Sequence, residues 1–180
     1  MQSTSSFWRD ANHVPITNNG VMVEDSITFS GNGTIHVPLF TITGTVEIIA
    51  LYGIVTTALG SNHTAAYFRL QDQTAQPDIT LNTGTTMSSA SNGSLIVKKD
   101  LATAAVTLSN ASAGRVTEPT TFETSYFSPF VVVQKTGSIK TEIEYVYSTN
   151  NSSAGAIKFY CGFVPISTDG DVAVSTTAAY

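Results

Sequence analysis

The feature that most constrains this chain is the shortness of its apolar runs and the residues that compose them. From Ser26 onward, runs rich in Val, Ile, Thr, Tyr and Phe alternate with turn residues such as the Ser30 to Gly33 stretch. Residues of these types favour the half-buried surface of a sheet. No segment of roughly ten residues or more shows the 3.6-residue apolar spacing of an amphipathic helix. The chain is therefore predicted to be built from strands.

The expected strands follow the apolar runs, and their ends follow the turn signals at Thr43-Gly44, Gly60-Ser61-Asn62 and Asn150 to Gly155. Leu101 to Leu108 leaves a strand and a short helix both open, because its alanine-rich centre obscures the period. The predicted strands are Ser26–Phe29, Thr34–Ile42, Val46–Thr57, Ala65–Gln71, Ile79–Leu81, Leu95–Lys98, Phe130–Gln134, Ser138–Tyr147 and Ala156–Pro165.

Two of these strands indicate where the sheets are buried. Alternation between Ile139 and Tyr147 places Tyr145 and Tyr147 on one face, and Lys140, Glu142 and Glu144 on the other. We expect that second face to meet solvent. The run from Val46 to Thr57 carries a single charge, so both of its faces should be covered and it should lie centrally.

Short strands at this spacing predict an all-β protein with a single domain, either a β-sandwich or a jelly roll. A chain of 180 residues is long enough to bury one core. Residues 1–22 are mostly polar and end in turn residues, which indicates an extended N-terminal arm. The β domain is then expected over residues 23–180. The run from Thr83 to Gly93 has the composition of an exposed loop.

The low charge of the chain excludes some classes of function. Only 12% of its residues are charged, about half the roughly 25% usual for soluble proteins, and the formal net charge is −5. Binding to nucleic acid needs clustered Lys and Arg, so we expect no nucleic-acid partner. No apolar stretch approaches the roughly 20 residues that cross a bilayer, so we expect no membrane partner. A surface of uncharged Ser and Thr suits contact with other subunits.

The residues that commonly carry chemistry are scattered, and we predict that the chain is not an enzyme and holds no metal or cofactor. His13, His36 and His63 lack metal-ligand spacing and are expected at the surface or satisfied in the core. Cys161 lies in an apolar run and should be a small core residue. No phosphate-binding or nucleophile-elbow motif is present.

Two alternatives remain for the acidic residues. Glu142 with Glu144, or Asp72 with Asp78, could serve as the carboxylate pair of a glycosidase, although the nearby tyrosines should lie on the opposite face. Thr168 to Asp171 resembles a fragment of a calcium loop but lacks most of its ligands, so a simple turn is expected.

The arm carries the best candidates for partner binding. A polar leader cannot bury large side chains within itself, and Trp and Arg are common anchors at interfaces. The alternative is that Trp8 folds back onto its own domain. The candidate partner-binding residues are Phe7, Trp8, Arg9, Val14, Pro15 and Ile16.

Three stretches resemble small virion structural proteins of tailed bacteriophages. The leader Trp8-Arg9-Asp10-Ala11-Asn12-His13-Val14-Pro15 is similar to the R-D-A-N-R-V-P-like opening of that family, with His13 in place of an arginine. Leu51 to Gly60, L-Y-G-I-V-T-T-A-L-G, resembles the central strand and turn of the family. Ala154 to Tyr160 with Val164-Pro165-Ile166 resembles its closing strand.

The resemblance implies a β-sandwich or jelly-roll subunit, often a homotrimer, on the surface of the virion. The first expectation is a capsid decoration or cement protein whose arm clamps the major capsid protein or other virion proteins. The alternative is a tail or fibre component that recognises a host surface glycan, through loops such as Thr83 to Gly93 or Asn150 to Gly155.

Overall fold

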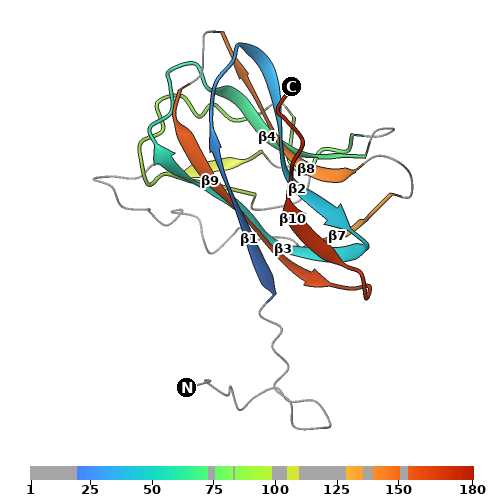
Figure 1. Cartoon of the computed structure of the whole chain (residues 1–180). Helices are drawn as coiled ribbons and strands as arrows, with labels where there is room; N and C mark the ends of the chain where they lie inside the picture. Colours follow the sequence, from blue (N-terminus) through green and yellow to red (C-terminus); the bar gives the residue numbers. More distant parts are fainter. Residues whose placement is uncertain are drawn as a thin grey trace, which may run out of the picture.

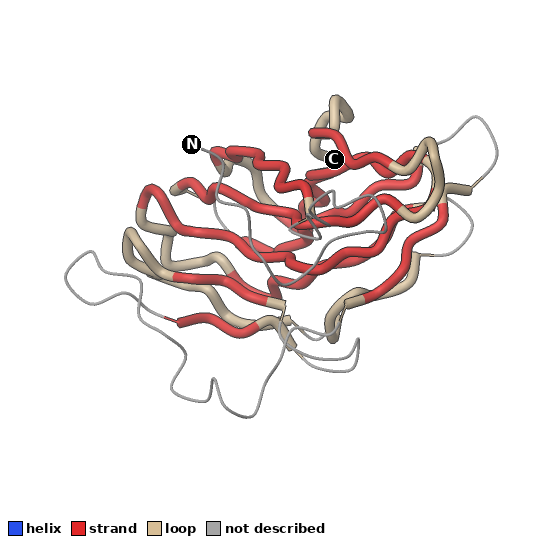
Figure 2. The backbone as a smooth tube through the Cα atoms, turned by 90° about the horizontal axis from the view of Figure 1, so that it is seen from below, coloured by secondary structure: helices blue, strands red, loops and turns tan. Residues whose placement is uncertain are grey.

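The fold is an arrangement of strands alone over the residues that a computed structural model describes, which are 20–72, 76–82, 84–98, 105–109, 129–135, 140–150 and 154–180. Within these ranges there is no helix, and hence none that could span a membrane (Figure 2). The strands are β1 (Val21–Thr28), β2 (Gly33–Thr43), β3 (Thr45–Thr57), β4 (Thr64–Gln71), β5 (Leu95–Val97), β6 (Thr107–Ser109), β7 (Phe130–Val133), β8 (Thr141–Thr149), β9 (Ala156–Pro165) and β10 (Asp171–Val174).

The strands form two antiparallel sheets that pack as a sandwich (Figures 1 and 2). The six-stranded sheet has the order β1-β9-β3-β5-β6, and β7 also pairs with β3. The four-stranded sheet has the order β10-β2-β8-β4. The predicted all-β sandwich is therefore confirmed. As expected, β3 is central, because it pairs with β9 along one edge and with β5 and β7 along the other.

The core lies between the sheets and follows the two-residue period of the strands. In β9, Ile157, Phe159 and Cys161 are fully buried, while the side chains between them are half-buried. Across the interface the ring of Phe159 lies 4.9 Å from the ring of Tyr145 on β8 and 6.1 Å from that of Phe68 on β4. Cys161 is thus the core residue that its neighbours predicted.

Most predicted strands are present, and β9 has the predicted bounds. The ambiguous run from Leu101 to Leu108 contributes to strand β6, and β10 was not predicted. Strand β1 begins at Val21, so the last two residues of the predicted arm belong to the sheet. Residues 1–19, with all six candidate arm residues, lie outside the described ranges.

Two predictions about local structure need correction: one expected strand is absent, and an expected loop is present but only partly exposed. Ile79–Leu81 is not a strand, because the amides of Ile79 and Thr80 both donate to one carbonyl, that of Phe68, while the Thr80 hydroxyl accepts from the Phe68 amide. Within the expected loop from Thr83 to Gly93, Met87 and Ala90 are buried. Gly84, at φ +66°, lies so close to Ala65 that no side chain fits there, and this close approach brings the segment onto the sandwich.

Candidate functional site

The outer face of β8 carries the largest group of interacting charged and polar side chains among the described residues. Glu142 and Glu144 point away from the core, as the alternation predicted, but they are only 4% and 0% exposed. The expectation that this face meets solvent is therefore wrong. Strand β8 is enclosed by β2 and β4, and residues 175–180, here called the strap, run along the far edge of β2 and reach over the outer side of β8 with their side chains.

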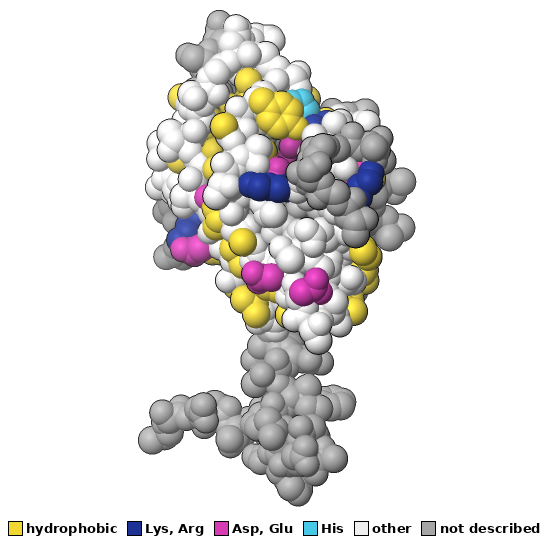
Figure 3. Space-filling view, turned by 45° about the vertical axis from the view of Figure 1, so that its right-hand side comes forward, with side chains coloured by type: hydrophobic (Ala, Val, Ile, Leu, Met, Phe, Trp, Pro, Cys, Tyr) yellow, Lys and Arg dark blue, Asp and Glu magenta, His cyan; other side chains and the backbone are white. Residues whose placement is uncertain are grey.

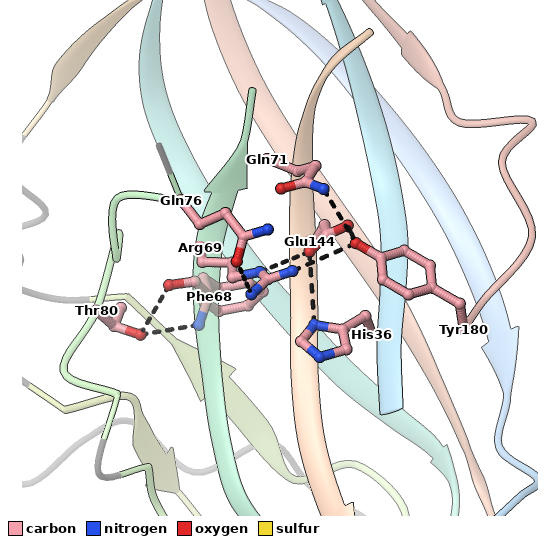
Figure 4. A network of polar contacts seen from close by, with 8 residues as sticks. All are labelled: His36, Phe68, Arg69, Gln71, Gln76, Thr80, Glu144 and Tyr180. Carbon is pink, nitrogen blue, oxygen red and sulfur yellow. Dashed lines mark hydrogen bonds and ion pairs between the residues drawn. The ribbon is translucent and has the colours of Figure 1, made fainter. Parts of the chain in front are cut away.

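Glu144 is held by an ion pair and a phenol. Arg69 lies opposite it on β4 and donates from Nε to Glu144 Oε2 at 2.7 Å. The hydroxyl of Tyr180 donates to the other carboxylate oxygen, Oε1, also at 2.7 Å. Arg69 further donates to Gln76 at 2.7 Å, so its guanidinium is held from several sides (Figure 4). Charge-assisted hydrogen bonds of this length are strong when they are buried.

His36 completes this cluster from β2. Its ring stacks on the ring of Tyr180, with centroids 5.1 Å apart and planes 14° from parallel. Its Nδ1 lies 3.7 Å from Glu144 Oε2, which is beyond hydrogen-bond distance. Burial and the positive charge of Arg69 lower the pKa of His36, and the opposing effect of Glu144 does not cancel them. The imidazole is therefore expected to be neutral near pH 7.

Glu142 is satisfied by hydroxyl groups. Its Oε1 accepts hydrogen bonds from Thr41 at 3.1 Å, from Ser175 at 2.6 Å and from Thr177 at 2.8 Å. Two of these three donors, Ser175 and Thr177, belong to the strap. Because Tyr180 of the strap binds Glu144, both glutamates of β8 are bonded to this segment. The two carboxylates therefore act as anchor points for a chain segment that the period-two pattern did not anticipate.

The strap also bonds to β2 through its main chain. The amide of Ser175 donates to the carbonyl of Leu39 at 2.9 Å, just past the end of β10. Tyr180 and His36 exchange both of their main-chain hydrogen bonds, at 2.8 and 3.0 Å. The strap thus extends the edge of the four-stranded sheet beyond β10 and brings its last side chain over Glu144.

A second polar group lies inside the core. His63 is fully buried, and its Nε2 lies 2.9 Å from the hydroxyl of Tyr145. Its ring stacks on that of Tyr147 at 4.3 Å and meets Phe29 edge-on at 4.8 Å. Burial lowers the pKa of His63 to about 4. The expectation of a satisfied core histidine is confirmed for Nε2, whereas Nδ1 has no hydrogen-bond partner among the described residues.

The other residues singled out in the sequence do not come together in a common site among the described residues. Burial raises the pKa of the Cys161 thiol to about 12, so this cysteine is inert as a nucleophile. Residues 167–170 form a turn and Asp171 begins β10. In the part of the chain that the structure describes, no three His, Cys, Asp or Glu residues are grouped to hold a metal. His13 lies outside that part.

Searches for related proteins find nothing similar. No protein-family model, curated protein or solved structure matches this chain. Function must therefore be argued from the geometry and from the motifs of the sequence. Chemically, the cluster around Glu144 has its donors and acceptors directed at one another, which suits closure of the fold more than attack on a substrate. A lone arginine in the otherwise uncharged strand β4 was the one sequence signal for it.

The hydroxyl of Tyr180 gives a direct test of how the strap is held. Tyr180→Phe keeps the ring on His36 but removes a donor to a buried carboxylate. We expect unfolding free energy to fall by about 1 to 3 kcal/mol, measured by urea denaturation. Tyr52→Phe is the matched control, because the hydroxyl of Tyr52 has no hydrogen-bond partner among the described residues. Equal stability of the two variants would show that the Tyr180 hydroxyl does not anchor the strap.

Proposed function

We propose that this chain is a bacteriophage virion structural protein, and that it acts as a capsid decoration or cement protein that binds and stabilises the major capsid lattice. The observation that carries the proposal is the closure of the sandwich. The two carboxylates on the outer face of β8 are committed to holding the strap, and on the face seen in Figure 3 charged side chains are few among uncharged and apolar ones. Such a molecule contributes binding surface. The motif resemblance at both ends and the centre of the chain supports the same proposal.

The strand order supports the finer proposal that the sandwich is a jelly roll. Strands β1 to β4 alternate between the two sheets, β9 inserts between β1 and β3, and β8 inserts between β2 and β4. This interleaving of early and late strands is what two nested Greek keys produce.

In the proposed mechanism, attachment uses binding energy alone. The arm, with Phe7, Trp8 and Arg9 as anchors, adds contact area on neighbouring capsid subunits. Extended main chain in the arm can pair with the sheet edge of a neighbouring subunit. In an assembly of several copies, these contacts act together and raise avidity.

Deletion of residues 1–19 tests the proposal and leaves β1 intact. We expect the truncated protein to melt at the temperature of the full chain but to lose attachment to purified capsids, measured by co-sedimentation. Replacing Phe7 and Trp8 with Ala in the full chain should give most of the same loss. Unchanged occupancy of the capsids would refute the role of the arm.

The position on the particle separates the capsid proposal from the tail or fibre alternative. A decoration protein should label the head in immunogold micrographs and be present in hundreds of copies. Label confined to the tail, with few copies, would replace the capsid proposal with the alternative.

A further inference from the structure

The outer face of the six-stranded sheet is a broad and mostly apolar surface. In β9 the inward side chains are Phe159, Cys161 and Phe163, so Tyr160 and Val164, which alternate with them, point outward. Residues of β1 and β3 that lie opposite these positions, and residues of β7 opposite β3, belong to the same outer face. The apolar side chains are most exposed near the margins, at 52% for Met22, 55% for Val131 and 64% for Val133.

The centre of this outer face combines a row of large side chains with a row of small ones. Tyr160 and Tyr52 are opposite one another in the register, with their rings stacked at 4.9 Å and 16° from parallel. The next outward row along the strands holds Gly162 and Ala50. A Cβ at Gly162 would lie 3.1 Å from that of Ala50 and 3.4 Å from side-chain atoms of Ile49 and Met22, so this row is closely packed and its own side chains are much shorter than the tyrosines.

Among the described residues, charges on the outer face are few, and Lys158 and Glu47 lie towards its two ends. Lys158 pairs with Glu24 at 2.6 Å and lies 5.7 Å from the ring of Tyr160. Glu47 lies near the other end, opposite Val164. The register separates Glu47 from the row of Lys158 by seven residues of β3, or about 23 Å.

The size of the outer face fits one partner. Four strands at about 4.8 Å make it roughly 19 Å wide, and ten residues at about 3.4 Å make it roughly 34 Å long. The footprint of roughly 650 Å² approaches the roughly 800 Å² that each partner buries in a standard interface.

We propose that the outer face of the six-stranded sheet is the contact between two copies of this chain. A two-fold axis can lie in the contact plane, across the strands and between the tyrosine row and the Gly162 row. This axis places the tyrosines of each copy over the small residues Gly162 and Ala50 of the other. It also directs Glu47 of each copy towards Lys158 of the other, so the surface is complementary to itself. Because such a contact closes after two copies, it predicts a dimer in place of the implied trimer. The contact does not depend on the proposed place in the virion.

A charged side chain in the row of small residues tests this contact. The full chain should sediment with twice its 19.0 kDa mass when concentrated and dissociate on dilution. Ala50→Lys places an ammonium beneath the tyrosines of the second copy, so dimer dissociation should become at least about tenfold easier. Val131→Lys should weaken the dimer less, because this side chain lies near the margin.

Val174→Lys is the matched control, since Val174 is 42% exposed on the other sheet. It should leave the dimer unchanged, and circular dichroism should show all three variants folded. A monomer at every concentration, or an Ala50→Lys protein that associates as tightly as the original, would overturn the proposal. So would a trimer whose mass the Ala50→Lys change does not affect.

Discussion

Replacing Arg69 by Met should destabilise the protein by about 3 to 5 kcal/mol, the largest effect we expect from a single substitution. Methionine fills most of the space of the arginine stem but leaves Glu144, which is 0% exposed, without its cation. A buried carboxylate that loses its partner still bears the cost of leaving water. Urea denaturation of the purified variant measures the change.

The matched control is Lys158→Met, which breaks the other Lys or Arg ion pair seen among the described residues. Lys158 and Glu24 are 31% and 56% exposed, so water replaces the lost partner and stability should change little. The double variant Arg69→Met/Glu144→Leu should recover much of the stability lost in Arg69→Met, because it removes both charges together. If Arg69→Met were no more harmful than Lys158→Met, Arg69 would not be the partner that compensates the buried Glu144.

The second large effect is a loss of stability in mild acid that arises from His63. Its pKa is about 4 in the folded protein and near the ordinary 6.5 when unfolded. Between these values the unfolded chain takes up a proton that the folded chain does not. The unfolding free energy should therefore fall as the pH drops from 6.5 to about 4, by about 3 kcal/mol in total, and this contribution should level off below about pH 4.

His63→Gln isolates this contribution, because glutamine can still bond to the Tyr145 hydroxyl but does not titrate. Denaturation curves of both proteins at about pH 7.5 and about pH 4.5 give the comparison. The difference in stability between them should shift in favour of the variant at the lower pH. Parallel pH profiles would mean that His63 is protonated as easily inside the protein as outside it.

The strands that could be predicted from sequence are those with local signals. Strand β9 has an apolar run closed by turn residues at its start and Pro165 at its end, and both bounds were predicted. Strands β6 and β10 are only three and four residues long. They are strands because they pair with β5 and β2, and runs this short show too little local periodicity to reveal that pairing.

The carboxylate cluster was likewise predictable in its local pattern but not in its contacts with a distant segment. The alternation correctly placed Tyr145 and Tyr147 in the core and the two glutamates on the opposite face. Whether that face was exposed to solvent depended on the strap, which begins more than thirty residues after Glu142 in sequence. A period-two pattern describes which side chains share a face, but it contains no information about what later covers that face. The arm and its partners remain predictions.

The long-range pairing of the sandwich has a consequence for synthesis on the ribosome. Strand β1 pairs with β9, where Thr28 lies opposite Ala156, and His36 of β2 bonds to Tyr180. Both early segments can therefore pair only after these late residues have been synthesised. Neither sheet can be completed until those late residues have left the exit tunnel, so the nascent chain must remain soluble while its apolar strands are unpaired. Folding of the sandwich should therefore begin only after β9 and the strap have been synthesised, and it should be slow for the size of the domain.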